Sequence, residues 1–409
     1  MTRLAYLIAG LALASASTAA ADPNCPGPSC TATCDTLSLP PIVYFQTGDT
    51  QTNLMKAMGR KLRDNTPRPL TIGFITSGSC TNIQEAYHKT AAISATISYA
   101  PSTAEVATWD AGSAAFTCKA PANTFPDVDN SAVFNSACTS EAPPNNVVVN
   151  NGPIQAYVMA VPELSDQTAM TAEEAYFVWG FGMAGMISPW TDESNMFMRT
   201  VTKSTQITWS DSIGVPPNRW KGSAFDQSAQ VLSSLQNSQK PEAAIGILGD
   251  EVYDGARDTL NVLAFRAYGQ YAAYYPDSTF TSHDKKNLRD GHYTVWSPTT
   301  YMNYIDPASG APLNDDAQYI IDLIIGEDSN ATPAPNFAAS DVVASVGLVP
   351  DCAMQVQRAF DGGPLSLYSA PESCKCRYEA TVDTSTCATC DDSTPCSTGV
   401  CRDGYCEAN

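Results

Sequence analysis

Three short segments gather hydroxyl, amide and guanidinium groups where a helical pattern begins. They are TGDTQTN (47–53), TSGSCTN (76–82) and RTVTKST (199–205). A helix N-terminus presents unpaired N–H groups and about half a positive charge, so it favours an anion. Gly78 lets the backbone approach a ligand closely, and the fork of donors on Arg199 suits a carboxylate or a tetrahedral oxyanion. The segments therefore predict a site for a small oxyanion.

Each segment also has an ordinary structural interpretation. Serine, threonine, asparagine and aspartate are common helix N-caps, and glycine is common in turns. An arginine such as Arg199, taken alone, is most often a surface or salt-bridge residue. Ligands of parallel sheets lie at the carboxyl ends of the strands. Because all three segments follow a predicted strand, the set favours a ligand site.

The elements that position these segments alternate between strand and helix. IVYFQT is typical of a strand, and Leu54, Met55, Met58 and Leu62 follow it at helical spacing. PLTIGFIT and NIQEAYHKTAAI repeat the pair, which predicts a parallel sheet. Thr171 and Glu174 have capping-box spacing. Further strands are expected at IQAYVMAVP, MFMRT and RDGHYTVWSP, and further helices at TAEEAYFVWG, 202–213 and LNDDAQYIIDLIIG. KPEAAIGILG and TLNVLAFRAYG continue the alternation.

The composition limits the partners and the compartment. The 409 residues carry a formal charge of −20, which argues against DNA, RNA and anionic membranes as partners. Residues 1–21 resemble a secretory signal, with Arg3 before the apolar run LAYLIAGLALA. That run is too short to span a bilayer. We expect a soluble exported monomer in the periplasm, at the cell envelope or secreted, without membrane insertion.

The fourteen cysteines fall into an early group of six and a late group of eight, with none in 139–351. In an exported chain this favours disulfides, whose connectivity the spacing leaves open. Cys387 and Cys390 have the spacing of half a zinc site, but no histidine lies near, so we expect no metal. From about Cys374 aliphatic residues almost disappear, which predicts a separate disulfide-held tail. The segment SHDKKNLRDGHY (282–293) mixes charges of both signs and is expected on the surface or at a domain boundary.

At this point the segments resemble a known family, the phosphate-binding (PstS-like) periplasmic proteins of ABC transporters, in the type II periplasmic-binding-protein superfamily. GDTQTN resembles the family's N-terminal Gly-x-Thr loop, and IGFITSGSCTNIQEAY its SGSG loop and following helix. PDVDNSAVF resembles the segment ending in Ser-Asp, and RTVTKST resembles R-x-D-x-S-G-T. AAIGILG and RDGHYTVWSP resemble later landmarks. The likeness covers roughly 40–350.

The resemblance implies an α/β fold of two lobes, with mixed sheets flanked by helices, hinge crossovers and an anion between the lobes. The expected divisions are a signal peptide (1–21), a Cys/Pro-rich segment (22–41), lobe one (42–145), lobe two (146–290), the return to lobe one (291–365) and a Cys-rich appendix (366–409). The ligand-binding residues that it implies are Thr50, Ser77, Gly78, Ser79, Asn130, Ser131, Arg199, Lys203, Ser204 and Thr205.

Two departures separate the sequence from the family pattern. The aspartate of Ser-Asp is Ala132, and the aspartate after the arginine is Val201. Acidic acceptors in the family help to recognise the proton on phosphate, and a site of donors alone does not favour a protonated oxyanion. Asp127 or Asp129 could supply a displaced acceptor or act as a cap. Lys203 could add charge or point to solvent. The fold is expected to carry over, while phosphate as the ligand is not.

No feature of the sequence predicts catalysis. His88, His283 and His292 lack metal-ligand spacing, and no serine lies in a Gly-x-Ser-x-Gly motif. We therefore expect no catalytic residue, no cofactor and no enzyme activity. The expected function is capture of a small, phosphate-like oxyanion for ABC-type uptake or sensing, with a permease or envelope partner. The alternative is a non-transport cell-envelope interaction protein that keeps the fold but has lost phosphate binding.

Overall fold

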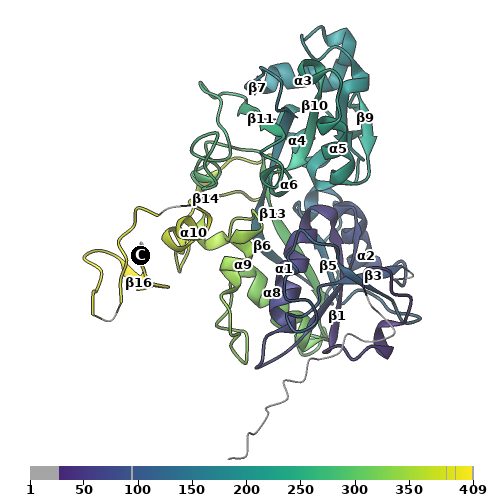
Figure 1. Cartoon of the computed structure of the whole chain (residues 1–409), viewed down its shortest axis with the longest axis vertical. Coiled ribbons are helices and arrows are strands. Elements are labelled where there is room, and N and C mark those ends of the chain that lie inside the picture. The colour runs from purple at the N-terminus through teal and green to yellow at the C-terminus, as the bar shows by residue number, and fades with distance from the viewer. Residues whose placement is uncertain (1–26, 94, 384, 392, 408–409) are drawn as a thin grey trace, which may run out of the picture.

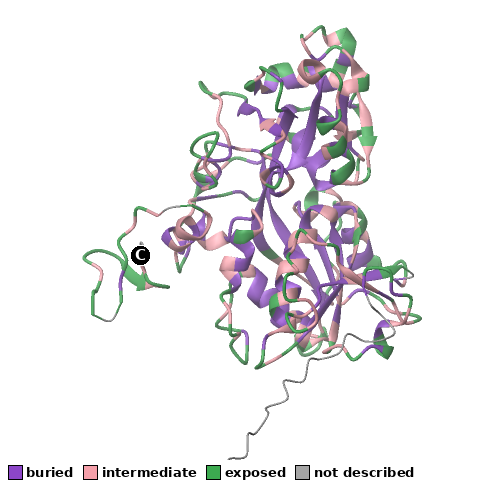
Figure 2. Ribbon diagram, viewed as in Figure 1, coloured by how far each residue is buried: buried purple, intermediate pink, exposed green. Residues whose placement is uncertain are grey.

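The structure, a computed structural model, describes residues 27–93, 95–383, 385–391 and 393–407. The expected signal peptide and Cys25 lie outside the described residues. The chain forms two α/β lobes, one above the other in Figure 1, and two long strands run between them. Buried residues follow the strands of both lobes and the inner faces of the helices (Figure 2).

Lobe one contains a mixed seven-stranded sheet in the order β4-β3-β2-β1-β5-β13-β6. β1 pairs in parallel with β2 and with β5, as the repeated strand-helix pattern predicted, whereas β13 runs antiparallel to β5 and β6. The strands are β1 (Ile42–Gly48), β2 (Thr71–Ser77), β3 (Thr96–Tyr99), β4 (Phe116–Lys119), β5 (Val128–Ser131), β6 (Val147–Pro162) and β13 (Trp296–Tyr304).

Lobe two continues the same sheet through β6, β10, β8 and β9, with β11 also paired to β6. β8 is parallel to both of its neighbours. The strands are β8 (Met196–Arg199), β9 (Ser223–Phe225), β10 (Ile245–Gly249) and β11 (Leu260–Val262). Three two-stranded pairs are β7 (Ala169–Thr171) with β12 (Ala264–Arg266), β14 (Val356–Gln357) with β15 (Ser366–Leu367), and β16 (Val400–Arg402) with β17 (Tyr405–Glu407).

Strand β6 joins the lobes. Its first ten residues, Val147–Ala156, run beside β13 in lobe one, and the following residues pair with β10 and β11 in lobe two. The second crossing precedes β13, where Val295 accepts a hydrogen bond from the Tyr157 backbone N–H at 3.0 Å. The strand is longer than the predicted IQAYVMAVP, because the preceding residues 147–151, three valines and two asparagines, also pair with β13.

The helices cover both faces of the sheet. In α1, the residues that recur at helical spacing, Leu54, Met55, Met58 and Leu62, are all buried against the lobe-one sheet. Thr171 and Glu174 form the predicted capping box at the start of α3. The helices are α1 (Thr52–Arg63), α2 (Ser79–His88), α3 (Ala172–Phe181), α4 (Ser204–Ile213), α5 (Ser228–Gln236), α6 (Asp250–Asp254), α7 (Lys286–Arg289), α8 (Asp315–Ile325), α9 (Ala339–Ser345) and α10 (Lys375–Val382).

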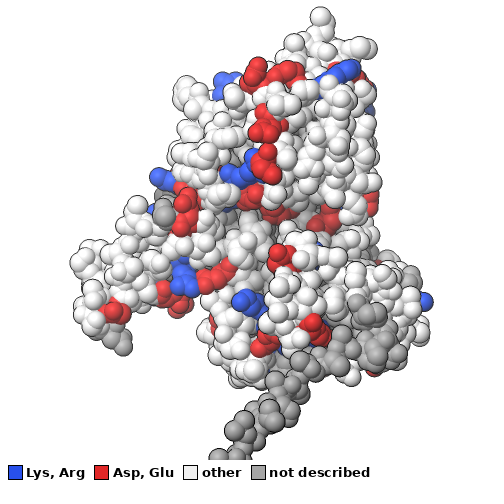
Figure 3. Space-filling view, in the orientation of Figure 1, with Lys and Arg blue, Asp and Glu red and all other residues white. Residues whose placement is uncertain are grey.

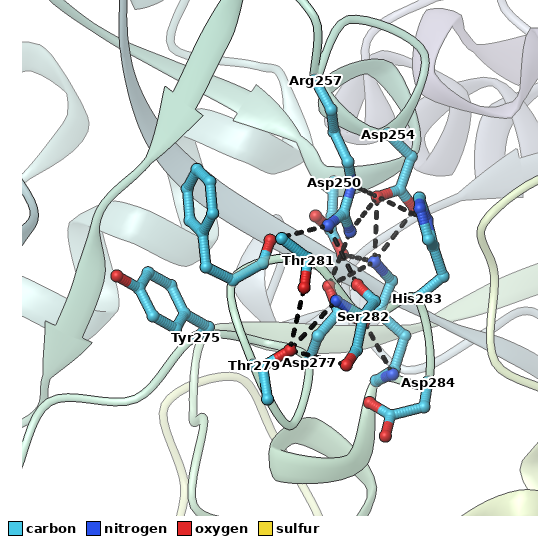
Figure 4. Close-up of polar contacts among 12 residues, drawn as sticks. Asp250, Asp254, Arg257, Tyr275, Asp277, Thr279, Thr281, Ser282, His283 and Asp284 are labelled. Atoms are coloured by element: carbon cyan, nitrogen blue, oxygen red, sulfur yellow. Dashed lines mark hydrogen bonds and ion pairs between the residues drawn. The ribbon is translucent and has the colours of Figure 1, made fainter. Parts of the chain in front are cut away.

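The mixed-charge segment 282–293 is not simply a surface loop. Lys285 and Arg289 within it are 1% and 0% exposed. The Lys285 ammonium lies 2.7 Å from Asp250, 2.9 Å from Asp254 and 3.3 Å from Asp277. These acids come from α6 and from a loop, so their clustering depends on contacts that are distant in sequence (Figure 4). The expectation of a surface position is therefore wrong for these two basic side chains.

Disulfides join cysteines within each of the two groups. The described pairs are Cys34–Cys118, Cys80–Cys138, Cys352–Cys374, Cys376–Cys387, Cys390–Cys401 and Cys396–Cys406. Both cysteines of the possible zinc half-site are thereby oxidised, which removes their thiolates as ligands.

The Cys-rich tail begins with a helix that packs on the body. α10 places Tyr378, 2% exposed, in the main apolar cluster of lobe two. The Arg289 guanidinium donates to Glu379 at 2.7 Å. The chain therefore becomes a separate projection only beyond α10, later than the change in composition at Cys374 suggests. Figure 1 shows β16 in the outer part of this projection.

We expect the disulfides of the two groups to contribute unequally to stability. Cys34–Cys118 closes a loop of 84 residues and lies in a buried cluster of lobe one, so its replacement by two serines should cost about 2 to 4 kcal/mol. Replacing Cys396–Cys406 by serines should leave the main unfolding transition unchanged, because that pair lies in the projection. Calorimetric unfolding of both variants measures this difference, and equal losses would contradict it.

Acidic side chains lie on both lobes in the face drawn in Figure 3, with basic side chains beside some of them. Among the described residues, no helix combines the length and the apolar character needed to cross a membrane.

Candidate functional site

The predicted segments meet where the two lobes face each other. Residues 47–53 follow β1 and 76–82 follow β2 in lobe one, while 199–205 follow β8 in lobe two. The lobes touch at this point, since the Cys80 N–H donates to the Thr202 carbonyl at 3.3 Å. A Cβ added to Gly78 would lie 2.7 Å from the Thr202 hydroxyl, so glycine is required for this approach. The structure therefore brings segments of both lobes together.

Arg199 is buried at this seam, and its donors are engaged by the chain itself. Its side chain is fully inaccessible to solvent. Nε donates to the Phe225 carbonyl at 3.2 Å, and Nη1 donates to the Ser228 hydroxyl. Nη2 donates to the Asp226 carbonyl at 2.8 Å and to both carboxylate oxygens of Asp49, at 2.9 and 3.0 Å. The guanidinium is therefore closed to another anion while Asp49 remains in place.

Asp49 joins the two lobes, because it lies in the turn between β1 and α1 while its partners belong to lobe two. Its Oδ2 also accepts the Ser228 backbone N–H, at the first residue of α5, at 2.8 Å. A guanidinium and a helix N-terminus are the two groups that proteins use to hold a carboxylate or oxyanion. The seam thus holds the chain's own carboxylate between a guanidinium and a helix N–H.

Thr50 belongs to a second network of hydrogen-bonded side chains across the seam. Its hydroxyl donates to Gln155 Oε1 at 3.2 Å, and Gln51 Nε2 donates to the same oxygen at 2.6 Å. Gln155 Nε2 in turn donates to Glu251 Oε2 at 2.8 Å. Burial raises the pKa of Glu251 well above its usual range. This hydrogen-bond network connects the start of α1 in lobe one to the start of α6 in lobe two.

The other predicted residues of lobe one bond within that lobe. Ser79 Oγ accepts the Ala132 N–H at 3.2 Å, and Asn130 Oδ1 accepts the Thr47 hydroxyl at 2.8 Å. Ser131 Oγ donates to the Val133 carbonyl at 3.0 Å. Ser77 is only partly buried, at the end of β2. These hydroxyls and amides organise the strand ends in this structure.

The two acids considered as displaced acceptors lie away from Arg199. Asp127 Oδ2 accepts the Tyr44 N–H at 2.8 Å, and its Oδ1 accepts from Asn314 at 2.9 Å. Asp129 accepts the Tyr304 hydroxyl at 3.1 Å, and burial raises its pKa well above the usual range. Both carboxyl groups therefore accept hydrogen bonds from residues of lobe one.

The first turn of α4 is the part of the predicted site with unused donors. Lys203 does not point freely to solvent, because its ammonium lies 3.2 Å from Asp226. Ser204 and Thr205 are buried behind it, and the Thr205 Oγ1 has no hydrogen-bond partner. The Lys203 side chain makes no cap to the helix. The start of this helix therefore has no side-chain cap, and a buried hydroxyl without a hydrogen-bond partner lies in its first turn.

Sequence reasoning missed four residues of the seam: Asp49, Gln155, Glu251 and Ser228. Asp49 lies inside TGDTQTN, at the variable position of Gly-x-Thr, where an aspartate is also typical of a turn. The signal that could have identified Asp49 is the balance of charge. A buried arginine needs an acidic partner, and the aspartate that follows the arginine in the family pattern is Val201 in this chain.

The predicted ligand-binding residues do not line the four cavities described next. Four cavities, of about 500, 440, 380 and 170 Å³, are each lined by described residues outside that set. The three histidines lie near the surface, each close to one carboxylate: His88 to Glu141, His283 to Asp254 and His292 to Asp290. An exchange of an internal anion for an external one would therefore require the lobes to separate.

Comparison with known proteins identifies the fold. No family model matches the sequence, and no curated protein matches it. Among solved structures, a candidate phosphate ABC transporter substrate-binding protein from Clostridium perfringens, with bound phosphate, matches at a TM-score of 0.51 and 12% identity, over 76% of this chain and 99% of that one. An ABC-type phosphate transport receptor from Vibrio cholerae matches at a TM-score of 0.46 and 10% identity, over 76% and 99%.

At such identities the comparison informs on the fold and leaves the ligand open. The chain has the two-lobed α/β fold of the Clostridium perfringens periplasmic-type binding protein, with a disulfide-rich C-terminal addition.

Proposed function

We propose that this protein is an exported solute-binding protein that captures a small oxyanion or carboxylate between its two lobes. In this proposal Arg199, Ser228 and the first turn of α4 bind the anion, and Asp49 holds its place when no ligand is present. The observation that carries the proposal is the carboxylate held between the lobes by a guanidinium and a helix N–H.

The unpaired groups of α4 support the same position. A buried hydroxyl without a partner costs about 1 to 3 kcal/mol, so a ligand that accepts from Thr205 would recover this free energy. Arg199 is the last residue of β8, and Ser204 and Thr205 are the first two residues of α4, which follows a short turn. Delivery to an ABC-type permease, or sensing, is the role that the fold suggests for such a ligand.

Titration with anions tests the proposal. We expect phosphate, sulfate, arsenate or a small carboxylate to stabilise the mature protein by about 2.7 kcal/mol at a hundred times its dissociation constant, measured as a melting shift. Arg199→Ala should abolish the shift and Thr205→Val should weaken binding. Arg219→Ala is the matched control, because Arg219 is an exposed arginine of the same lobe. An anion-induced shift that is the same in Arg199→Ala and in the wild type would contradict the assignment.

A second candidate function is a non-transport interaction protein of the cell envelope. The position of Asp49 favours this second candidate. If its carboxylate occupied the proposed anion site permanently, the lobes would stay closed and no external anion would bind. The projecting tail could then contact a partner. Wild-type protein that responds to no anion, together with an Asp49→Ala variant that does respond, would favour this candidate. If neither protein responds, the seam does not bind anions and the first proposal fails.

A further inference from the structure

An apolar patch lies on the solvent-facing side of α3 and on the turn that follows this helix. Phe177 and Phe181, which are one helical turn apart, are 44% and 43% exposed. Met183 and Met186, in the turn, are 69% and 82% exposed. The solvent side of an amphipathic helix normally carries polar groups. Figure 1 shows α3 in the end of lobe two that lies away from lobe one, so the patch is separate from the seam.

The patch is continuous, and the fold holds it in place. The rings of Phe177 and Phe181 have centroids 5.6 Å apart, and the Tyr176 ring lies 5.4 and 5.6 Å from them. A Cβ added to Gly185 would collide with the Phe177 carbonyl oxygen, so the turn is pressed against the helix. We define the α3 patch as Tyr176, Phe177, Phe181, Met183 and Met186.

The core of lobe two is complete without the most exposed members of the patch. The buried face of α3 consists of Ala175, Val178 and Trp179, which pack in the main apolar cluster. The two phenylalanines and the two methionines lie outside that cluster. Aromatic residues and methionine are enriched at protein interfaces, and a group of exposed apolar side chains marks a contact surface.

The first end of the patch carries an excess of negative charge. Glu173 and Glu174, in the first turn of α3, are both exposed. Arg266 faces Glu173 across the surface at 3.1 Å. Among the described residues, no cation lies within ion-pair distance of Glu174. Two acids therefore stand against one base at this end.

The second end carries an excess of positive charge. The Lys221 backbone N–H donates to the carbonyl of Trp179, in the last turn of α3, at 2.7 Å. Lys221 and Arg219 are exposed, and neither has a carboxylate within ion-pair distance in the part of the chain that the structure describes. Glu193 is the acid at this end, and its carboxylate accepts the Met183 N–H at 3.3 Å. Two bases therefore stand against one acid.

We propose that the α3 patch binds the α3 patch of a second copy of this chain, with the two helices antiparallel about a two-fold axis. The rotation places the start of one helix beside the end of the other. The negative end of each copy then faces the positive end of its partner, and the apolar side chains meet between them. Two-fold symmetry is the commonest symmetry of homo-oligomers, and it brings the same surface of both copies together.

The charges make other occupants less suitable. A surface of one sign, such as an anionic membrane, would be attracted at one end of the patch and repelled at the other. The charge of −20 on each copy opposes association, but exposed charges farther apart than about 8 Å are largely screened at physiological ionic strength. This inference does not rest on the proposed anion binding, because the patch shares no residue with the seam.

The size of the patch predicts a weak dimer. Each partner of a stable interface contributes about 20 to 30 residues, and the α3 patch is much smaller. We therefore expect a dissociation constant in the micromolar range. The monomer expected from the sequence would then be the form present in dilute solution.

Sedimentation equilibrium of the full mature protein tests the proposal, from low to high micromolar concentration at physiological ionic strength. We expect a reversible monomer–dimer equilibrium, and Phe177→Gln and Phe181→Gln should each weaken it about tenfold or more. Both side chains are partly exposed, so the fold should be retained, which melting curves verify. Phe125→Gln is the matched control, because Phe125 is 40% exposed and belongs to lobe one.

An exchange of charges tests the antiparallel arrangement. Lys221→Glu alone should weaken the dimer, because it removes a positive charge from the end that faces the acids of the partner. Lys221→Glu combined with Glu173→Lys should restore the dimer, because the two ends again carry opposite charges. Both residues are exposed, so neither change disturbs the core.

The outcomes are distinct. A dimer that is lost in the Phe177 and Phe181 variants, kept in the control and restored by the charge exchange supports the proposal. A protein that stays monomeric at every concentration overturns it, as does a dimer that the two variants leave unchanged. A charge exchange that fails to restore the dimer overturns the antiparallel pairing. Binding of the monomer to phosphatidylcholine vesicles, lost in Phe177→Gln, would overturn the dimer and assign the patch to a membrane surface.

Discussion

Replacing Asp49 by alanine should lower the free energy of unfolding by about 3 to 5 kcal/mol, because it leaves the Arg199 guanidinium buried without its counter-ion. Arg199 is fully inaccessible and the Asp49 side chain is 9% exposed, so the guanidinium loses its partner in a site that is shielded from bulk solvent. Chemical denaturation of the variant and of the wild type measures the difference. The unfolding transition should also become sensitive to salt composition, since small anions can now reach the guanidinium.

The surface pair of Lys240 and Asp192 provides the control. Their side chains are 64% and 36% exposed, and their atoms approach to 2.7 Å. Asp192→Ala should therefore cost no more than about 1 kcal/mol. Asp49→Ala combined with Arg199→Met should cost less than Asp49→Ala alone, because the buried charge is removed with its partner. An Asp49→Ala variant as stable as Asp192→Ala would show that Asp49 is not an essential partner of Arg199.

Added anions separate the two candidate functions in this variant. Acetate resembles the lost side chain, and phosphate and sulfate resemble the proposed ligands. If these anions restore stability to Asp49→Ala, the site made by Arg199 and the N-terminus of α5 recognises an external anion. If they also stabilise the wild type, the internal carboxylate is displaced by ligand, as expected of a receptor.

The course of the chain could be predicted because it depends on local patterns. The apolar spacing in α1 places four side chains on one face, and Thr171 with Glu174 marks the start of α3. Strand-turn-helix repetition predicts a parallel sheet, and the loops at the strand ends then converge at one edge. These rules identified the segments that meet at the seam without identifying their partners.

The partners could not be predicted, because they depend on contacts distant in sequence. Asp49 and Arg199 are 150 positions apart, and they belong to different lobes. Lys285 lies in a segment whose mixed charges are typical of a surface, yet acids from two other segments surround it. A hydrophilic sequence does not distinguish a solvated charge from a buried, compensated one, since both require the same residue types.

That buried lysine carries the other large expected effect. Lys285→Met removes the ammonium that faces Asp250, Asp254 and Asp277, which lie together in Figure 4. Burial already raises the pKa of Asp250 to about 7, and Lys285 opposes this rise. Burial alone would raise the pKa of Asp254 as well, but Lys285 and Arg257 outweigh burial and lower it. Without Lys285, both carboxyl groups should bind protons more tightly in the folded state.

The variant should therefore lose about 3 to 5 kcal/mol of stability at pH 8 and less at pH 5. Carboxyl groups with pKa values above those of the unfolded chain bind more protons when folded, so stability falls as the pH rises from about 4 to above 7. Denaturation at both pH values measures this slope. Lys286→Met is the control, because Lys286 is the exposed neighbour and its loss should change stability by no more than about 0.5 kcal/mol. A Lys285→Met variant whose loss is equal at the two pH values would contradict the role of the ammonium as counter-ion to these acids.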